Sequence, residues 1–207
     1  QYKNREHLRY RGAAFFLVKP YLEHPPFFGL VAGSFALLNG AKDMYDIDLK
    51  TIRPLAIILG IMSIFLVFLL TSELYDKKAA FLAALLYATI PTIVVGSRIV
   101  QNENFFIPMW LLALFSTSKY LKNKNSLYRN IAGVLCGLLI ISKVPFIAAA
   151  GSIVLIFLYL RRYKDLLKFV AIVIPIGLLY LVYGLYWDAK VFIDLWGLQL
   201  ARYDISF

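Results

Sequence analysis

The sequence predicts an all-α fold, a polytopic bundle of transmembrane helices, and three observations support this. Of the 207 residues, 61% are hydrophobic and only 16% are charged, compared with about 45–50% and about 25% in an ordinary soluble domain. The mean hydropathy is +0.72. The apolar residues also form long runs, several of which approach the roughly 20 residues that cross a bilayer. This composition excludes a soluble enzyme, a disordered chain and a disulfide-rich secreted protein.

Five apolar runs have the composition of membrane helices: residues 54–72, 79–97, 105–118, 131–160 and 166–187. The fourth run is too long for one crossing. It breaks near Lys143-Val144-Pro145 and therefore predicts two helices, 131–142 and 146–160. The shorter run 27–38 is interrupted by glycine, and three alternatives remain open for it: it spans the membrane, dips into it or lies at its surface.

A single domain is expected, because the chain contains no linker, low-complexity tract or internal repeat. We expect residues 1–26 to form an outer juxtamembrane segment and residues 27–187 to hold about six to seven hydrophobic segments. Residues 188–207 are expected to follow on the outer side. The chain begins without Met and is expected to be a fragment.

The distribution of basic residues predicts the orientation. The net charge of +10 comes from 22 Lys and Arg against 12 Asp and Glu, an excess that in a membrane protein reflects cytoplasmic loops and anionic head groups rather than nucleic acid. Residues 119–129 hold four cations and no acid, and residues 161–168 hold four cations and Asp165. Both segments are expected in the cytoplasm, which places Lys143 on the opposite side. Counting backwards puts residues 42–53 on that same outer side, and residues 23–26 should lie there too if they join the same site as Lys143. The run between them would then re-enter the membrane or lie flat on it, or one of the spans is miscounted.

Several kinds of site are absent from the sequence. It contains no P-loop, GxGxxG, CxxC pair, HExxH or Ser-His-Asp arrangement, so we expect no nucleotide cofactor. Two histidines and one cysteine disfavour a zinc cage. Dependence on another divalent metal remains open.

The first candidate site is Glu23-His24, directly before Pro25-Pro26. Prolines favour the first turn of a helix and keep the preceding residues extended. Glu23 and His24 are therefore predicted just outside the membrane, at a helix N-terminus that favours anions. The alternative is an ordinary helix start with interfacial charges.

The second candidate is Lys143, an isolated cation between two apolar runs. A lysine at a membrane helix is costly and therefore suggests a functional role, and its ammonium group is a strong partner for phosphate. The alternative is a lysine that extends to the lipid head groups at little cost.

The third candidate is the polar interruption at residues 96–104. Arg98 can bind phosphate, while Glu103 can bind a sugar hydroxyl, a metal or an acceptor. The alternative is a solvated loop in which Arg98 and Glu103 pair with each other. Arg202 is a weaker candidate for substrate binding, because it follows aromatic residues that are typical membrane-interface anchors.

In order along the chain, these stretches resemble the membrane glycosyltransferases of the GT-C fold, close to the aminoarabinose lipid A transferases and the protein O-mannosyltransferases. The likeness is carried by Glu23-His24-Pro25-Pro26 and its helix, residues 53–91, residues 98–103, and the small-residue run 132–143 that ends in Ser142-Lys143. Each motif is weak alone, and their order and spacing are the specific signal.

The resemblance implies a GT-C-like bundle, here partial, that uses a polyprenyl-phosphate-linked sugar donor. It implies that His24 and Lys143 lie beside the lipid phosphate, with Arg98 as a further cation. Glu23 then matches a first-loop acid, and Glu103, or Asn102 beside it, matches a second acidic position. Relatives carry an Asp just after their first transmembrane helix as the general base. This chain starts downstream of that point, so the fragment is expected to be inactive.

The expected function is transfer of a sugar to an acceptor hydroxyl or phosphate on a glycan, lipid or protein. The expected location is a multi-pass protein of a prokaryotic plasma membrane, with its site on the non-cytoplasmic side. Two alternatives stay open: a segment of a transporter or flippase, in which Lys143 and Glu103 line a substrate path, and a non-catalytic membrane subunit.

Overall fold

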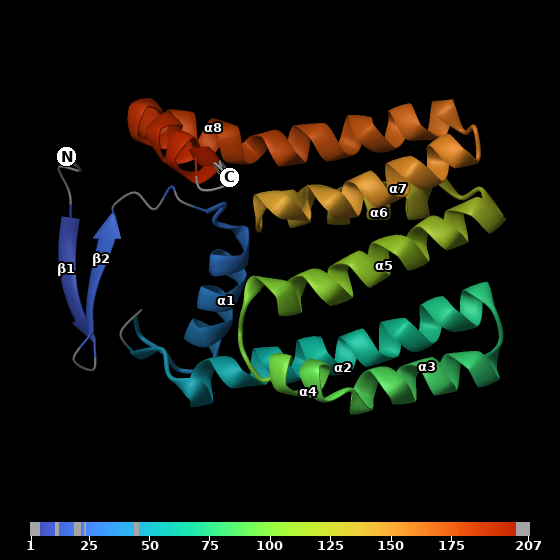
Figure 1. Ribbon diagram of the computed structural model, residues 1–207, viewed down its shortest axis with the longest axis horizontal. Helices are drawn as coiled ribbons and strands as arrows, with labels where there is room; N and C mark the ends of the chain where they lie inside the picture. The colour runs from blue at the N-terminus through green and yellow to red at the C-terminus, as the bar shows by residue number, and fades with distance from the viewer. Residues whose placement is uncertain (1–4, 11–12, 19–21, 23, 44–45, 202–207) are drawn as a thin grey trace, which may run out of the picture.

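The computed structural model describes residues 5–10, 13–18, 22, 24–43 and 46–201, and its main body is a bundle of helices (Figure 1). This confirms the predicted all-α class. The helices are α1 Phe27–Leu38, α2 Leu49–Leu74, α3 Lys77–Thr89, α4 Pro91–Gly96, α5 Asn102–Asn123, α6 Ser126–Ile140, α7 Ile147–Tyr159 and α8 Tyr163–Ala201, with the 3-10 turn η2 Val144–Phe146 between α6 and α7.

A small hairpin precedes the bundle. Strands β1 (Arg5–Tyr10) and β2 (Ala13–Val18) pair in antiparallel register. The second strand is the run Ala-Ala-Phe-Phe-Leu-Val, whose Phe and Val residues favour extended structure. In Figure 1 the hairpin stands beyond one end of the bundle. It is an addition to the expected helices and falls within the predicted juxtamembrane segment.

The long helices lie along the bundle, and their connections alternate between its two ends (Figure 1). We call one end the site end, because it carries residues 39–43, 46–48, 97–101 and 141–146. The other is the basic end, which carries residues 75–76, 124–125 and 160–162. This alternation agrees with the predicted sequence of crossings, in which the two basic loops share one end and Lys143 lies at the other.

Two of the helices are long and apolar enough to cross a membrane, Leu49–Leu74 and Tyr163–Gly197. They contain the predicted runs 54–72 and 166–187. Helix α8 bends at Asp188, whose backbone is extended (φ −163°, ψ 93°). The Asp188 Oδ1 atom accepts a hydrogen bond from the Val191 N–H at 3.0 Å, as an N-cap residue does. The part of α8 after the bend therefore starts as a new helix.

The predicted run 79–97 is divided, which corrects the expectation of one continuous segment. Helix α3 ends at Thr89, and Ile90 adopts an extended conformation (φ −62°, ψ 118°) before Pro91 begins α4. The proline ring disfavours helical geometry in the preceding residue and is itself well suited to a first helical turn. The predicted break near Lys143, in contrast, is confirmed by the separation of α6 from α7.

Helix α1 crosses the site end of the bundle instead of running along it (Figure 1). Its 12 residues extend only about 18 Å at 1.5 Å per residue, compared with a hydrocarbon core of about 30 Å. The Phe27 N–H donates to the Ile141 carbonyl at 3.2 Å and fixes the start of α1 to the end of α6. This course explains how residues 24–26 and the start of α2 reach the same end of the bundle.

The main core lies between α5, α6, α7 and α8, and its centre is fully buried at Cys136, Leu139, Ile153, Phe157 and Phe169. Small residues on α6 allow a close approach to α8. A Cβ atom added at Gly137 would lie 2.6 Å from the Ile176 Cβ, a distance at which the helices would have to separate.

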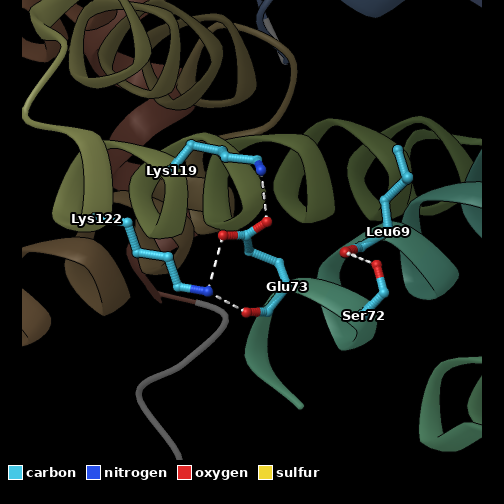
Figure 2. A network of polar contacts seen from close by, with 5 residues as sticks. All are labelled: Leu69, Ser72, Glu73, Lys119 and Lys122. Atoms are coloured by element: carbon cyan, nitrogen blue, oxygen red, sulfur yellow. Dashed lines mark hydrogen bonds and ion pairs between the residues drawn. The ribbon is translucent and has the colours of Figure 1, made fainter. Parts of the chain in front are cut away.

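Polar contacts connect α2 to α5 at the basic end. Figure 2 shows the Glu73 carboxylate between two lysines of α5. Its oxygens lie 2.6 Å from the Lys119 Nζ and 2.9 Å from the Lys122 Nζ, and the Lys122 ammonium group also donates to the Glu73 carbonyl. The Glu73 side chain is only 12% exposed, and both of its carboxylate oxygens form ion pairs with the two lysines.

Candidate functional site

The centre of the candidate site is an ion pair between Lys143 and Glu103. The Lys143 Nζ donates to the Glu103 Oε1, joining the turn after α6 to the first turn of α5. The two side chains are 33% and 48% exposed, so a ligand can reach both. Glu103 thus pairs with Lys143 rather than with Arg98, which corrects the alternative of a local Arg98–Glu103 pair.

The local sequence explains why Lys143 lies at this turn. Helix α6 ends at Ile140, and the buried Ser142 hydroxyl donates to the Leu138 carbonyl at 2.8 Å. Pro145 then lies in the 3-10 turn that leads into α7. Between these two structures Lys143 is extended (φ −160°, ψ 125°). Its side chain therefore leaves the apolar helices and reaches the start of α5.

The ion pair determines the charge state of the site. The hydrogen bond from Lys143 lowers the pKa of Glu103 below its ordinary value, although partial burial acts in the opposite direction. The Lys143 Nζ also lies 5.8 Å from the centre of the Phe146 ring, within the range of a cation–π interaction. While the pair is intact, the Glu103 carboxylate is ionised at neutral pH and is a weak base.

A cavity of about 930 Å³ lies beside Glu103, between α2, α3, α4 and the start of α5. This volume is at the upper end of the range for small-molecule sites, about 300–1,000 Å³. Apolar side chains form part of the wall. The polar residues that line it are Arg53, Ser63, Tyr87, Thr92, Ser97, Arg98, Gln101, Glu103 and Asn104.

Two arginines from different elements line this cavity. Arg98 belongs to the segment between α4 and α5, where the Asn104 side-chain amide donates to the Gly96 carbonyl at 2.7 Å and also to the Ile99 carbonyl. These bonds hold the segment against the first turn of α5. Arg53 comes from the first turns of α2. Arg53 is not among the site residues predicted from the sequence, although a cation directly before the apolar run 54–72 is a usable signal.

Of the remaining candidates, Asn102 and His24 lie within the part of the chain that the structure describes. The Asn102 Oδ1 atom is buried and has no hydrogen-bond partner within the described part of the chain, which leaves an acceptor available. His24 is half-buried and lies three residues before Phe27, whose N–H is bonded beside the Lys143 turn. His24 therefore belongs to the site end. Glu23 and Arg202 lie outside the described residues.

No group of three or more His, Cys, Asp or Glu side chains that could hold a metal ion occurs among the described residues. The site that the fold assembles consists of cations, one carboxylate and neutral polar groups.

The family model of the dolichyl-phosphate-mannose-protein mannosyltransferases matches residues 23–187, which is well over half of the chain. The chain belongs to this family. No curated protein and no solved structure shows significant similarity to it. Membership in the mannosyltransferase family confirms the predicted resemblance at this level and identifies a membrane glycosyltransferase of the mannosyltransferase type. The matched residues include Glu103, Lys143 and the whole cavity.

Proposed function

We propose that this mannosyltransferase-family protein transfers a sugar from a polyprenyl-phosphate-linked donor to an acceptor at the site end of the bundle. We further propose that it is a multi-pass protein of a prokaryotic plasma membrane, with the site end on the non-cytoplasmic side. The observation that carries the proposal is the Lys143–Glu103 pair at the edge of a cavity lined by Arg53 and Arg98.

The cations of the site fit the charge that develops in this reaction. The acceptor oxygen attacks the anomeric carbon, and the bond from that carbon to the phosphate oxygen breaks with its electron pair moving to the polyprenyl phosphate. Cations that are already in place near the leaving phosphate lower the barrier. Lys143, Arg98 and His24 are our candidates for this role. In-line attack predicts inversion of configuration at the sugar.

The ion pair also suggests how donor binding prepares the carboxylate. A donor phosphate competes with Glu103 for the Lys143 ammonium group, and the bond that lowers the pKa of Glu103 is then lost. The released carboxylate is a stronger base. It either accepts the proton of the acceptor hydroxyl or positions that hydroxyl for another base. The Asn102 Oδ1, which has no hydrogen-bond partner in the part of the chain that the structure describes, is a second acceptor for a sugar hydroxyl or for the hydroxyl of the acceptor.

Binding of a short-chain polyprenyl phosphate to the purified full-length protein in detergent tests the proposal. We expect Lys143→Ala to weaken binding at least tenfold and His24→Ala to weaken it less. Lys50→Ala is the matched control, because Lys50 is an exposed lysine at the same end and does not line the cavity. Equal binding by wild type, Lys143→Ala and the control would contradict the assignment and favour a transporter segment with an interfacial lysine.

A further inference from the structure

A second cluster of charged groups surrounds Tyr120 at the basic end, opposite the sugar-transfer site. The guanidinium carbons of Arg129 and Arg162 lie 5.6 Å and 5.3 Å from the centre of the Tyr120 ring. The Tyr120 hydroxyl donates to the Asp165 Oδ1 at 2.5 Å, and the Arg162 Nε lies 3.0 Å from the Oδ2 of the same carboxylate. Helix α6, the connection between α7 and α8, and the first turn of α8 therefore bring two arginines and one acid to Tyr120 of α5.

The charges in this cluster are not balanced. Both oxygens of Asp165 are engaged, one by Tyr120 and one by Arg162. Arg129 donates to the uncharged amide oxygen of Asn130 at 2.9 Å. The Arg129 Nε and the Arg162 Nη1 are buried and lack an acceptor among the described residues. Two arginines face one carboxylate, so the cluster has one positive charge in excess. Its two N–H groups without an acceptor among the described residues are unusual, because buried donors are almost always satisfied.

Other acids at the basic end are already engaged. Glu73 is held by Lys119 and Lys122 (Figure 2). The Asp76 Oδ1 accepts the N–H groups of Lys78 and Ala79 and so caps α3. No ion pair joins Arg129 to a carboxylate among the described residues, so an external anion can balance its charge.

The surroundings of the two arginines indicate what kind of anion this is. Large apolar side chains next to them in the chain are exposed: Leu127 is 58% exposed, Tyr163 57% and Leu167 69%. A soluble anion has no apolar part that would contact such a surface, whereas the acyl chains of a lipid cover it. An arginine fork also matches the planar geometry of two phosphate oxygens better than a lysine does.

We propose that Arg129 and Arg162 bind the phosphodiester of an anionic phospholipid, with the acyl chains against the exposed apolar side chains of α6 and α8. The net negative charge of the lipid balances the excess charge of the cluster, and zwitterionic lipids do so less well because their cationic group faces the basic loops. This site is separate from the donor site and does not depend on sugar transfer.

Native mass spectrometry of the full chain in detergent, with equal amounts of phosphatidylglycerol and phosphatidylcholine, tests the proposal. We expect wild type to retain phosphatidylglycerol at least fivefold more than phosphatidylcholine. Arg129→Gln should abolish this preference, and Arg129→Lys should restore part of it. Lys124→Gln is the matched control, because Lys124 is an exposed cation at the same end, in the connection between α5 and α6, and should keep the preference.

Three outcomes would overturn the proposal. If wild type retains both lipids equally, there is no anionic-lipid site. If Lys124→Gln and Arg129→Gln lose the preference for phosphatidylglycerol to the same extent, the lipid is held by general charge attraction at this end and not by a specific site. Displacement of the lipid by an equal concentration of inorganic phosphate would identify a soluble ligand instead. Arg162→Gln provides a second variant, and the midpoint of thermal unfolding of each variant shows whether the loss of the contact with Asp165 alters the fold.

Discussion

The ammonium group of Lys143 binds the carboxylate of Glu103 across the site end, although the two residues are 40 positions apart in the chain. The pair connects the turn between α6 and α7 to the first turn of α5. It places a cation and a carboxylate in direct contact, with both side chains partly exposed.

The Lys143–Glu103 pair predicts a pH-dependent contribution to stability. The folded-state pKa of Glu103 is lowered by Lys143, so the contribution is complete above the ordinary Glu value and is lost as the pH falls through the folded-state pKa. For a half-exposed pair we expect less than about 1 kcal/mol. The midpoint of thermal unfolding should differ between wild type and Glu103→Gln at pH 7, and this difference should disappear on acidification. A difference that grows at low pH would contradict the assignment.

The arginines that line the cavity should contribute to donor binding. We expect Arg53→Gln and Arg98→Gln each to weaken binding of a polyprenyl phosphate about tenfold, or about 1.4 kcal/mol, because each removes a charged donor from the cavity wall. Isothermal titration in detergent measures this. Lys42→Gln is an exposed control outside the cavity and should bind like wild type. An unchanged affinity in both arginine variants would place the phosphate outside this cavity.

Loss of Lys143 should slow catalysis in the full-length enzyme. If its ammonium group stabilises the leaving phosphate, Lys143→Ala should lower kcat by about 10²–10³. Release of labelled sugar from a lipid-linked donor, measured at saturating donor, separates this effect from weaker binding. Lys50→Ala should retain the wild-type kcat, and a Lys143→Ala enzyme with wild-type kcat would remove Lys143 from the mechanism.

The contact between α6 and α8 should not tolerate an added methyl group. Gly137→Ala puts a Cβ atom 2.6 Å from the Ile176 Cβ, which no side-chain rotation relieves. We expect a loss of about 1–3 kcal/mol, seen as a lower midpoint of thermal unfolding in detergent. Gly151→Ala is the matched control in α7, where no atom lies within 4 Å of the added Cβ. It should be neutral or stabilising, and equal losses in both variants would argue against the close contact.

A buried hydrogen bond attaches the N-terminal segment to α8. The Tyr180 hydroxyl donates to the Leu22 carbonyl at 2.9 Å, and Leu22 is 1% exposed. Tyr180→Phe leaves that buried carbonyl without this donor, at a cost of about 1–3 kcal/mol. Faster proteolysis before α1 should accompany the loss of stability. Tyr186→Phe, at a 79% exposed position of the same helix, should have neither effect.

Most helices could be predicted from the sequence, because long apolar runs leave few alternatives for residues in a membrane. The break inside the run 79–97 could not be predicted in this way. Pro54, Pro108 and Pro175 remain inside helices, whereas Pro91 separates α3 from α4. A proline alone therefore does not determine whether a helix bends or ends, since the outcome depends on which neighbours satisfy the freed backbone groups.

The site could be predicted in part. Lys143 and Glu103 could both be predicted as site residues, because they are charged residues beside apolar runs. Their pairing could not be predicted from local spacing, because it depends on how α5 packs against α6. Local spacing instead suggested Arg98 as the partner of Glu103. Arg53 was missed for a related reason: it becomes a cavity residue only because the start of α2 faces the segment between α4 and α5.

The crosswise position of α1 predicts that the chain on both sides of this helix faces one compartment. Cysteines introduced at His24 and Lys42 should thus react with a membrane-impermeant maleimide from the same side of a sealed vesicle, while the native Cys136 is buried and should stay unlabelled. A cysteine at Lys124 should react only from the opposite side. The β1–β2 hairpin, which stands beyond this end of the bundle (Figure 1), is then predicted to lie in the same compartment as the cavity beside Glu103.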